Sequence, residues 1–228
     1  MSSNSKKGRL IMAGTGIGNP KDIPQRSLEY ANSADMMIFE EDRPARQILK
    51  AAGVHRDYFK FSEHKDNDTL DELRQCLKNK GTACYMSDQG MPILADPGKE
   101  LLKVAYQQNS QISVIPGPSS VTAAIAACPF IDNSFYFKGF LPRNSEARLK
   151  ALKALSKNID PFIILDTPYR LKPLVSDVAN LIPKRKCLLA IDISGDQEEF
   201  IYSNTTKLAS DIAKVPKKLN FVLIVKGV

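Results

Sequence analysis

The stretch RLIMAGTGIGNP, residues 9–20, places a short apolar run directly before a loop in which every second residue is glycine. The apolar run predicts a buried strand, and the glycines of 14–18 predict a tight turn that leads into a helix. Because glycine has no side chain, such a loop also lets a ligand approach the backbone closely. The stretch therefore predicts the first strand-to-helix unit of an α/β fold.

Working outward from this loop, apolar runs keep alternating with amphipathic segments as far as residue 115. The expected strands are 9–13, 36–39, 57–61, 82–86 and 112–115, and the expected helices are 23–33, 44–52, 67–79 and 98–108. Asp22 is the expected N-cap of the first helix. Strands that alternate with helices predict a parallel sheet with right-handed crossovers.

The pattern changes after the Pro-rich loop around residue 117. We expect a small-residue helix at 120–127, a charged helix at 145–157 and a helix at 205–213, with strands from 135 and at 161–166, 187–193, 198–202 and 220–225. The sequence predicts a disordered tail over 1–8 and two α/β domains. The first, 9–117, has a parallel sheet, and the second, 118–228, has a mixed sheet, with the boundary between 117 and 134.

Composition narrows the class of protein. Of the 228 residues, 43% are hydrophobic and 25% are charged, which is typical of a globular protein. The four cysteines form no CxxC pair and there are two histidines, so we expect no metal site and reduced thiols. No apolar stretch approaches the ~20 residues of a membrane span, and the N-terminus does not read as a signal peptide. We expect a cytoplasmic protein that does not bind a membrane.

The net charge of +7 is concentrated in the second half of the chain, where residues 121–228 hold 16 basic and 10 acidic side chains. Such an excess fits a polyanionic partner such as RNA, although a solvated surface accounts for it as well. The basic residues that would contact RNA are Arg148, Lys150, Lys153 and Lys157, together with Lys184, Arg185 and Lys186.

Three further loops follow expected strands, where open α/β sheets bind ligands. The loop 87–98 is long and rich in Gly and Pro, and its Asp88 and Asp96 either form an acid–base pair or brace turns. The hydroxyls of loop 115–120 either bind a carboxylate or cap the next helix. The fourth loop is 166–171. A nicotinamide dinucleotide site, with Glu40 or Glu41 on the ribose, is a weaker alternative because the third glycine of GxGxxG is missing.

Taken together, the motifs are much more specific than any one loop. In chain order they are TGIGN at 15–19 with Asp22-Ile23, ED at 41–42, EH at 63–64, SDQGMP at 87–92 with DPG at 96–98, IPGPS at 115–119, KGFLPR at 138–143 and TPYRL at 167–171. This series resembles the tetrapyrrole (class III) methylase superfamily, and most closely its ribosomal RNA small-subunit methyltransferase I branch of ribose 2′-O-methyltransferases. The likeness covers about residues 9–202.

The resemblance implies a homodimeric two-domain enzyme that binds S-adenosylmethionine (SAM) in the cleft between its domains. By the same resemblance, the SAM pocket is formed by Gly16, Ile17, Gly18, Asp88, Gly90, Met91, Leu94, Ser119, Ser120, Val121 and Thr167. A ribose hydroxyl is a poor nucleophile and needs a base, and family position nominates Glu41, Asp42 and His64. A surface or hydrogen-bonding role is the alternative for His64.

The chain also departs from the family pattern on the side expected to meet the acceptor. Arg43-Pro44 stands where the family has Thr-Arg, Lys65 replaces an asparagine, and the acidic 192–196 replaces Arg-Glu-Leu-Thr-Lys. Longer members continue into a further C-terminal domain beyond the equivalent of Val228. Three hypotheses follow: a SAM-dependent RNA methyltransferase, a methyltransferase for a tetrapyrrole or other small molecule, and a SAM- or RNA-binding protein without catalysis.

Overall fold

The computed structural model describes residues 7–62, 67–214 and 218–228. The chain divides into two compact units, Met1–Ser119 and Ser120–Val228, and each is described by itself. Most of the predicted tail, residues 1–6, lies outside the described residues. Gly8 is buried, and its carbonyl accepts the N–H of Gln111 at 2.8 Å.

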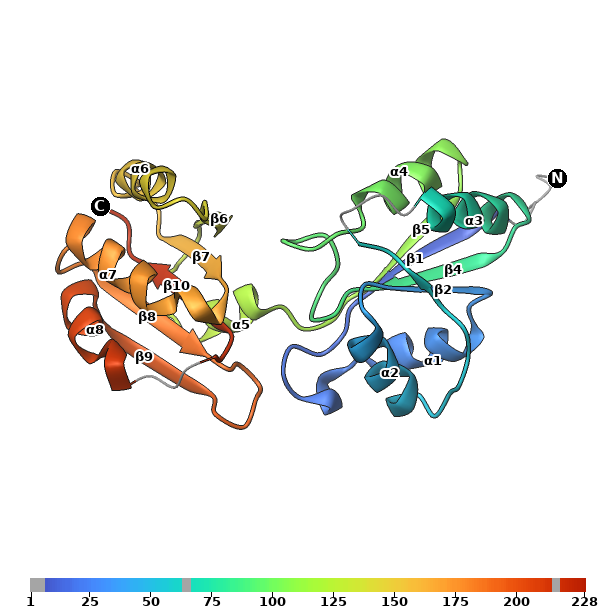
Figure 1. The fold of residues 1–228 in the computed structure, drawn as a ribbon, viewed down its shortest axis with the longest axis horizontal. Coiled ribbons are helices and arrows are strands. Elements are labelled where there is room, and N and C mark those ends of the chain that lie inside the picture. Colours follow the sequence, from blue (N-terminus) through green and yellow to red (C-terminus); the bar gives the residue numbers. More distant parts are fainter. Residues whose placement is uncertain (1–6, 63–66, 215–217) are drawn as a thin grey trace. The chain divides into compact units, whose positions relative to one another are not determined.

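The first unit is a parallel sheet covered by helices on both faces (Figure 1). Its strands are β1 (Arg9–Ala13), β2 (Met36–Phe39), β3 (Phe59–Lys60), β4 (Thr82–Met86) and β5 (Gln111–Ile115). Its helices are α1 (Gln25–Ser33), α2 (Asp42–Ala51), α3 (Asn67–Lys78) and α4 (Lys99–Gln107), with a 3-10 turn at Pro20–Asp22. The strand order is β3-β2-β4-β1-β5.

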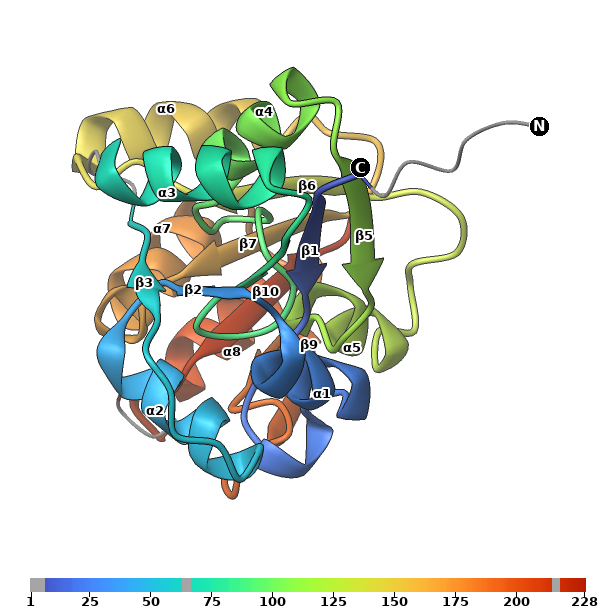
Figure 2. The same cartoon turned by 90° about the vertical axis from the view of Figure 1, so that its right-hand side faces the viewer.

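Each face of this sheet carries its own core, because the side chains of a strand point alternately to its two faces. Leu10 and Met12 of β1 pack with α3 and α4, whereas Ile11 and Ala13 pack with α1 and α2. Figure 2 shows these helix pairs on opposite sides of the sheet. Buried strands inside a helix-covered sheet explain why β1 and β2 read as almost continuous apolar runs.

The second unit has a mixed sheet of order β6-β7-β10-β8-β9, in which β6 and β7 are parallel and the other pairs are antiparallel. Its strands are β6 (Tyr136–Phe140), β7 (Phe162–Asp166), β8 (Lys186–Ile191), β9 (Glu199–Asn204) and β10 (Phe221–Val225). Its helices are α5 (Ser120–Ala126), α6 (Ser145–Leu155), α7 (Leu171–Leu181) and α8 (Thr205–Asp211), with 3-10 turns at Pro168–Arg170 and Ile212–Lys214. The predicted fold class, a parallel and a mixed sheet, is confirmed.

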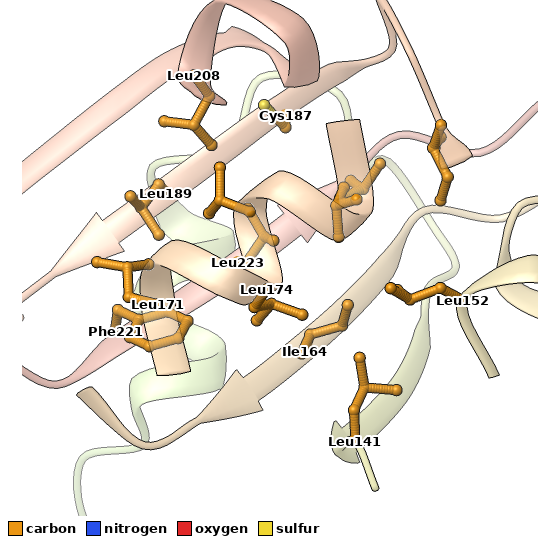
Figure 3. Close-up of a cluster of buried hydrophobic side chains, with 14 of the residues drawn as sticks. Leu141, Leu152, Ile164, Leu171, Leu174, Cys187, Leu189, Leu208, Phe221 and Leu223 are labelled. Carbon is orange, nitrogen blue, oxygen red and sulfur yellow. The ribbon is translucent and has the colours of Figure 1, made fainter. Parts of the chain in front are cut away.

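Two local features differ from the sequence-based expectation. The N-cap of α1 is Pro24, and Asp22 belongs to the preceding 3-10 turn. Helix α7 was not expected, yet its buried Leu171, Leu174 and Val178 form part of the second unit's core. In Figure 3 Leu174 extends from α7 toward Ile164 of β7. Within the described ranges, no helix has both the length and the apolar character needed to cross a membrane.

Candidate functional site

The parallel strands of the first unit bring three of the predicted loops to one edge of the sheet. Strand β1 lies between β4 and β5, and Ala13 is in register with Met86 and with Ile115. The chain segments that follow these residues are 14–18, 87–98 and 116–119. They therefore begin side by side at the carboxyl ends of the strands, where open α/β sheets bind ligands.

The first and third of these loops touch backbone to backbone. The N–H of Gly14 donates to the carbonyl of Ile115 at 3.0 Å, which extends the pairing of β1 with β5. A Cβ placed on Gly14 would lie 2.7 Å from the Cα of Gly117, and a Cβ on Gly117 would lie 2.9 Å from the Cα of Gly14. Only glycine fits at both positions, so these two residues are required by the approach of the loops.

Hydrogen bonds join the first loop to the second. The N–H of Thr15 donates to Gly90 O at 2.8 Å, and the N–H of Gly90 donates to Gly16 O at 3.1 Å. The buried hydroxyl of Thr15 donates to the carbonyls of Ser87 and Gly90. Met91 links the second loop to the third, because its sulfur accepts the N–H of Gly117 at 3.1 Å. The three loops thus form one connected structure.

A pocket of about 570 Å³ lies between the first two of these loops and α2, and we call it the loop pocket. Its volume falls in the range of small-molecule binding sites. From the loops it is lined by Thr15, Gly16, Gly18, Pro20, Ile23, Asp88 and Gln89, and from α2 and its start by Pro44, Gln47, Ile48, Lys50 and Ala51.

The structure brings part of the predicted SAM set together. Gly16, Gly18 and Asp88 line the loop pocket. Ile17 and Gly90 face each other, since a Cβ on Gly90 would lie 3.1 Å from Cγ2 of Ile17. Of the other predicted positions, Met91 accepts a hydrogen bond from Gly117, and Leu94 is exposed. Ser119 is the last residue of the first unit. Three positions belong to the second unit and are described only within it: Ser120, Val121 and Thr167.

The predicted catalytic residues have different surroundings. Asp42 accepts hydrogen bonds from Tyr58 Oη at 3.0 Å and Lys60 Nζ at 3.2 Å, and these bonds hold its pKa below the usual range. Glu41 is exposed and its backbone N–H donates to Oδ1 of Asp88 at 3.1 Å. His64 and Glu63 lie outside the described residues. Their catalytic roles stay predictions.

Glu40, which the sequence suggests only for the nicotinamide alternative, lies beside the loop pocket. It follows β2 directly, and its Oε2 lies 3.5 Å from the backbone N of Asp88, at the end of the neighbouring β4. Burial raises the pKa of Glu40 to about 7, with further increases from the charges of Asp88 and Asp96. The sequence does show an acidic residue after each of two expected strands, Glu40 after β2 and Asp88 after β4. That these two strands are neighbours follows only from the strand order of the sheet.

We predict that Glu40→Gln stabilises the protein at pH 8 and has little effect near pH 5. In the folded chain the pKa of Glu40 is raised from 4.5 to about 7, so the unfolded chain releases this proton first. The contribution of Glu40 to stability therefore falls as pH rises from 4.5 through 7 and stays low above it. Thermal unfolding at both pH values measures the difference. Glu72→Gln on α3 is the control, and an equal shift at both pH values would contradict the prediction.

The fourth predicted loop, 166–171, is built on a buried carboxylate in the second unit. Oδ1 of Asp166 accepts the N–H of Thr167 at 2.7 Å and lies 3.2 Å from Nη1 of Arg170. The guanidinium of Arg170 also donates to the carbonyls of Leu141 at 3.2 Å and Pro142 at 2.7 Å. Burial raises the pKa of Asp166, whereas the Thr167 N–H and Arg170 lower it. The position of Thr167 thus depends on Asp166 and Arg170.

Comparisons with known proteins show which family the chain is similar to. The model of the family Tetrapyrrole (Corrin/Porphyrin) Methylases matches residues 9–209. Ribosomal RNA small subunit methyltransferase I of Thermotoga maritima is 29% identical over 220 residues, which cover 96% of this chain and 99% of that protein.

Solved structures of low identity share the fold. Diphthine synthase has a TM-score of 0.70 at 13% identity, covering 96% of this chain and 90% of that chain. Uroporphyrin-III C-methyltransferase from Thermus thermophilus, solved as a complex with S-adenosylhomocysteine, has a TM-score of 0.64 at 14% identity, covering 96% of this chain and 97% of that chain.

Proposed function

Since the chain belongs to the tetrapyrrole (corrin/porphyrin) methylase family, we propose that it transfers a methyl group from SAM to a ribose hydroxyl of ribosomal RNA. Membership makes it a SAM-dependent methyltransferase of class III. The acceptor is the proposed part, and it is supported by the Thermotoga maritima relative, whose name specifies ribosomal RNA.

The observation that carries the proposal is the loop pocket, which lies between the first two loops and α2 at the carboxyl edge of the sheet. Its residues fit SAM. Gly16 and Gly18 of the first loop line the pocket, and the turn itself requires glycine at 16, because a Cβ there would lie only 2.8 Å from Asn19 O. Asp88 in the wall and Glu40 beside it are suited to a ligand that carries sulfonium and ammonium charges. Bound SAM supplies the electrophilic methyl group.

The protein's own part is to hold the reactants in line and to accept a proton. The hydrogen bonds of Thr15 and Gly90 fix the loops before the ligand arrives, so little ordering is needed on binding. A side chain with a pKa near neutrality serves best as a general base. Glu40, whose pKa is about 7, meets this condition, whereas the lowered pKa of Asp42 makes it a weaker base. Glu41 and His64 remain candidates by family position.

The remaining expectations belong to the proposal as well. Ile17, Gly18, Met91 and Leu94 of the first unit, and Ser119, Ser120, Val121 and Thr167 near or beyond the boundary, are proposed to complete the SAM site. The enzyme is proposed to act as a homodimer in the cytoplasm. A tetrapyrrole or other small-molecule acceptor is the alternative, and methyl-transfer assays separate it from RNA.

Isothermal titration with SAM and with S-adenosylhomocysteine tests the site. We predict that Asp88→Ala weakens SAM binding roughly ten- to a hundredfold, because it removes a carboxylate from the pocket wall and the acceptor of the Glu41 N–H. Asp68→Ala, on α3 at the other face of the sheet, is the control and should bind normally. Wild-type protein that binds neither ligand would contradict the methyltransferase assignment.

The acceptor is tested separately by transfer of radiolabelled methyl groups to small-subunit ribosomal RNA. Nuclease digestion followed by mass spectrometry then distinguishes a methylated ribose from a methylated base. A methylated ribose is the expected result. Label that enters a base contradicts the ribose assignment, and label that enters only a tetrapyrrole contradicts the RNA assignment.

A further inference from the structure

A second hollow lies on the other flank of α2, entirely within the first unit. It has a volume of about 800 Å³, and we call it the basic hollow. Lys50 lines both this hollow and the loop pocket, so α2 forms a wall shared by the two. The basic hollow is lined by Asp42, Arg46, Leu49, Lys50, Val54, His55, Arg56, Asp57, Tyr58, Phe59 and Lys60.

Three of the lining residues build the hollow. Asp42, at the start of α2, accepts hydrogen bonds from Tyr58 and Lys60 and so ties the helix to the edge strand β3. Arg56 donates to the carbonyls of Asn32 at 3.2 Å and Asp35 at 3.4 Å, which fixes the intervening loop against the end of α1. The ring of Tyr58 is held edge-on against Phe39, with centroids 5.3 Å apart. The walls are therefore fixed by internal contacts.

Two other cationic side chains of the hollow take no part in these contacts. Arg46 and Lys50 are exposed and lie four residues apart on α2, which places them on one face of the helix. Within the part of the chain that the structure describes, neither of them makes a hydrogen bond or an ion pair, and the charge of Arg46 contributes slightly to the lowered pKa of Asp42. Four Lys or Arg side chains line the hollow against two Asp, and one of these, Asp42, is already paired with Lys60. The hollow is thus suited to an anion.

An aromatic ring stands beside these charges. Phe59 belongs to β3, the two-residue strand at the edge of the sheet, and 38% of its surface is exposed. An exposed aromatic side chain next to unpaired Lys and Arg is the combination with which proteins bind single-stranded nucleic acid, by stacking a base and neutralising a phosphate. A purely hydrophobic partner would not neutralise the Lys and Arg charges, and a purely acidic partner would not stack on the aromatic ring.

We propose that the basic hollow binds one nucleotide of a single-stranded segment of the RNA acceptor, with its phosphate at Arg46 and Lys50 and its base on Phe59. This inference rests on the proposed function and assigns a contact surface to it. The shared wall of α2 places this nucleotide next to the loop pocket, where the methyl donor is proposed to bind. By contrast, Arg148, which was expected to contact RNA, is paired with Asp177 at 2.8 Å.

The test measures RNA binding without the methyl donor, by fluorescence anisotropy of a labelled oligo(A) of about 12 nucleotides, a length that one binding groove can cover. We expect Arg46→Glu, a variant of a residue that lines the basic hollow and not the loop pocket, to weaken binding at least about fivefold. It should also reduce the slope of log K against log salt by roughly 0.7 for each phosphate that the protein no longer neutralises. Phe59→Ala is expected to weaken binding roughly five- to fiftyfold with little change of the salt slope.

The matched control is Lys78→Glu on α3, the same reversal of charge at an exposed cation on the opposite face of the sheet. Weaker RNA binding by the α2 variant alone, with unchanged affinity for SAM, supports the proposal. Equal losses in both variants, an unchanged α2 variant, or a parallel loss of SAM affinity overturns it. Methyl transfer to ribosomal RNA by the wild-type protein is measured separately. A failure of the proposed function can therefore be distinguished from a failure of the proposed RNA contact.

Discussion

Gly14→Ala is expected to weaken SAM binding on the order of a hundredfold and to destabilise the protein by about 2–4 kcal/mol. The new Cβ would lie 2.7 Å from Cα and 2.8 Å from N of Gly117, and 2.9 Å from the sulfur of Met91. Two of these atoms are backbone, so a side-chain rotation cannot relieve the overlap and the loops must separate. Separation also strains the hydrogen bonds from Gly14 to Ile115 and from Ser27 Oγ to the Gly14 carbonyl.

A shift of about 1 Å in a ligand site costs on the order of a hundredfold in function, which is the loss of SAM affinity we expect. Titration calorimetry and urea unfolding measure the two effects. Gly53→Ala is the control: a Cβ there meets nothing within 4 Å, but its φ of +68° costs roughly 1 kcal/mol. This control should lose some stability and keep its SAM affinity. Normal SAM binding by Gly14→Ala would show that the loops do not need their close approach.

The sequence was sufficient to predict that the loops 14–18 and 87–98 follow strands of one parallel sheet, because the signals for this are local. An apolar run that ends in a glycine loop marks a strand end, and parallel strands place their ends along one edge. The contact of Glu40 with Asp88 could not be predicted, because it requires β2 and β4 to be neighbours although α2, β3 and α3 intervene in the chain. The paired state of Asp42 likewise depends on Tyr58 and Lys60, whose positions are set by the loop before β3.

Helix α7 was missed although its signal was present. Leu171, Leu174 and Val178 have the spacing of a helix face, but only the loop 166–171 was expected in this stretch. In the structure Pro173 is the third residue of α7, and Pro44 is the third residue of α2. The first turn of a helix has no internal acceptors for its N–H groups, so proline is tolerated there. This also explains how the chain accommodates its Arg43-Pro44 departure without losing α2.

Charge counts alone do not identify the cations that are available to RNA. The excess of Lys and Arg lies in the second half of the chain, but counting does not show which of these groups are paired. Arg148 bonds Asp177, 29 residues away, and Arg185 donates to the carbonyl of Ser156. In the nearly neutral first half, Arg46 and Lys50 stay unpaired among the described residues. Pairing, and not the total charge, decides which cations are available to a phosphate.

Arg170→Ala is expected to destabilise the second unit by about 3–5 kcal/mol, because it removes the cation from a buried carboxylate. The side chain of Asp166 has no exposed surface and that of Arg170 is 21% exposed. Oδ2 of Asp166 has no hydrogen-bond partner within the described residues. In the variant, the N–H of Thr167 is therefore the one donor to this carboxylate that remains among those residues. The carbonyls of Leu141 and Pro142 lose their donors as well. Urea unfolding measures the loss, with the exposed Arg143→Ala as control.

The pH dependence separates the loss of charge pairing from the loss of packing. Burial already raises the pKa of Asp166, and without Arg170 the carboxyl should take up a proton still more readily. A raised pKa in the folded state means that stability falls as pH rises, so Arg170→Ala should be less destabilised at pH 5 than at pH 8.

Adding Asp166→Asn removes the unpaired charge and should recover part of the stability at pH 8 but little at pH 5. A loss that is equal at both pH values and unaffected by Asp166→Asn would mean that Arg170 acts only through its bonds to the two carbonyls. Because Asp166 also holds the N–H of Thr167, the partial recovery should extend to SAM affinity if Thr167 belongs to the site.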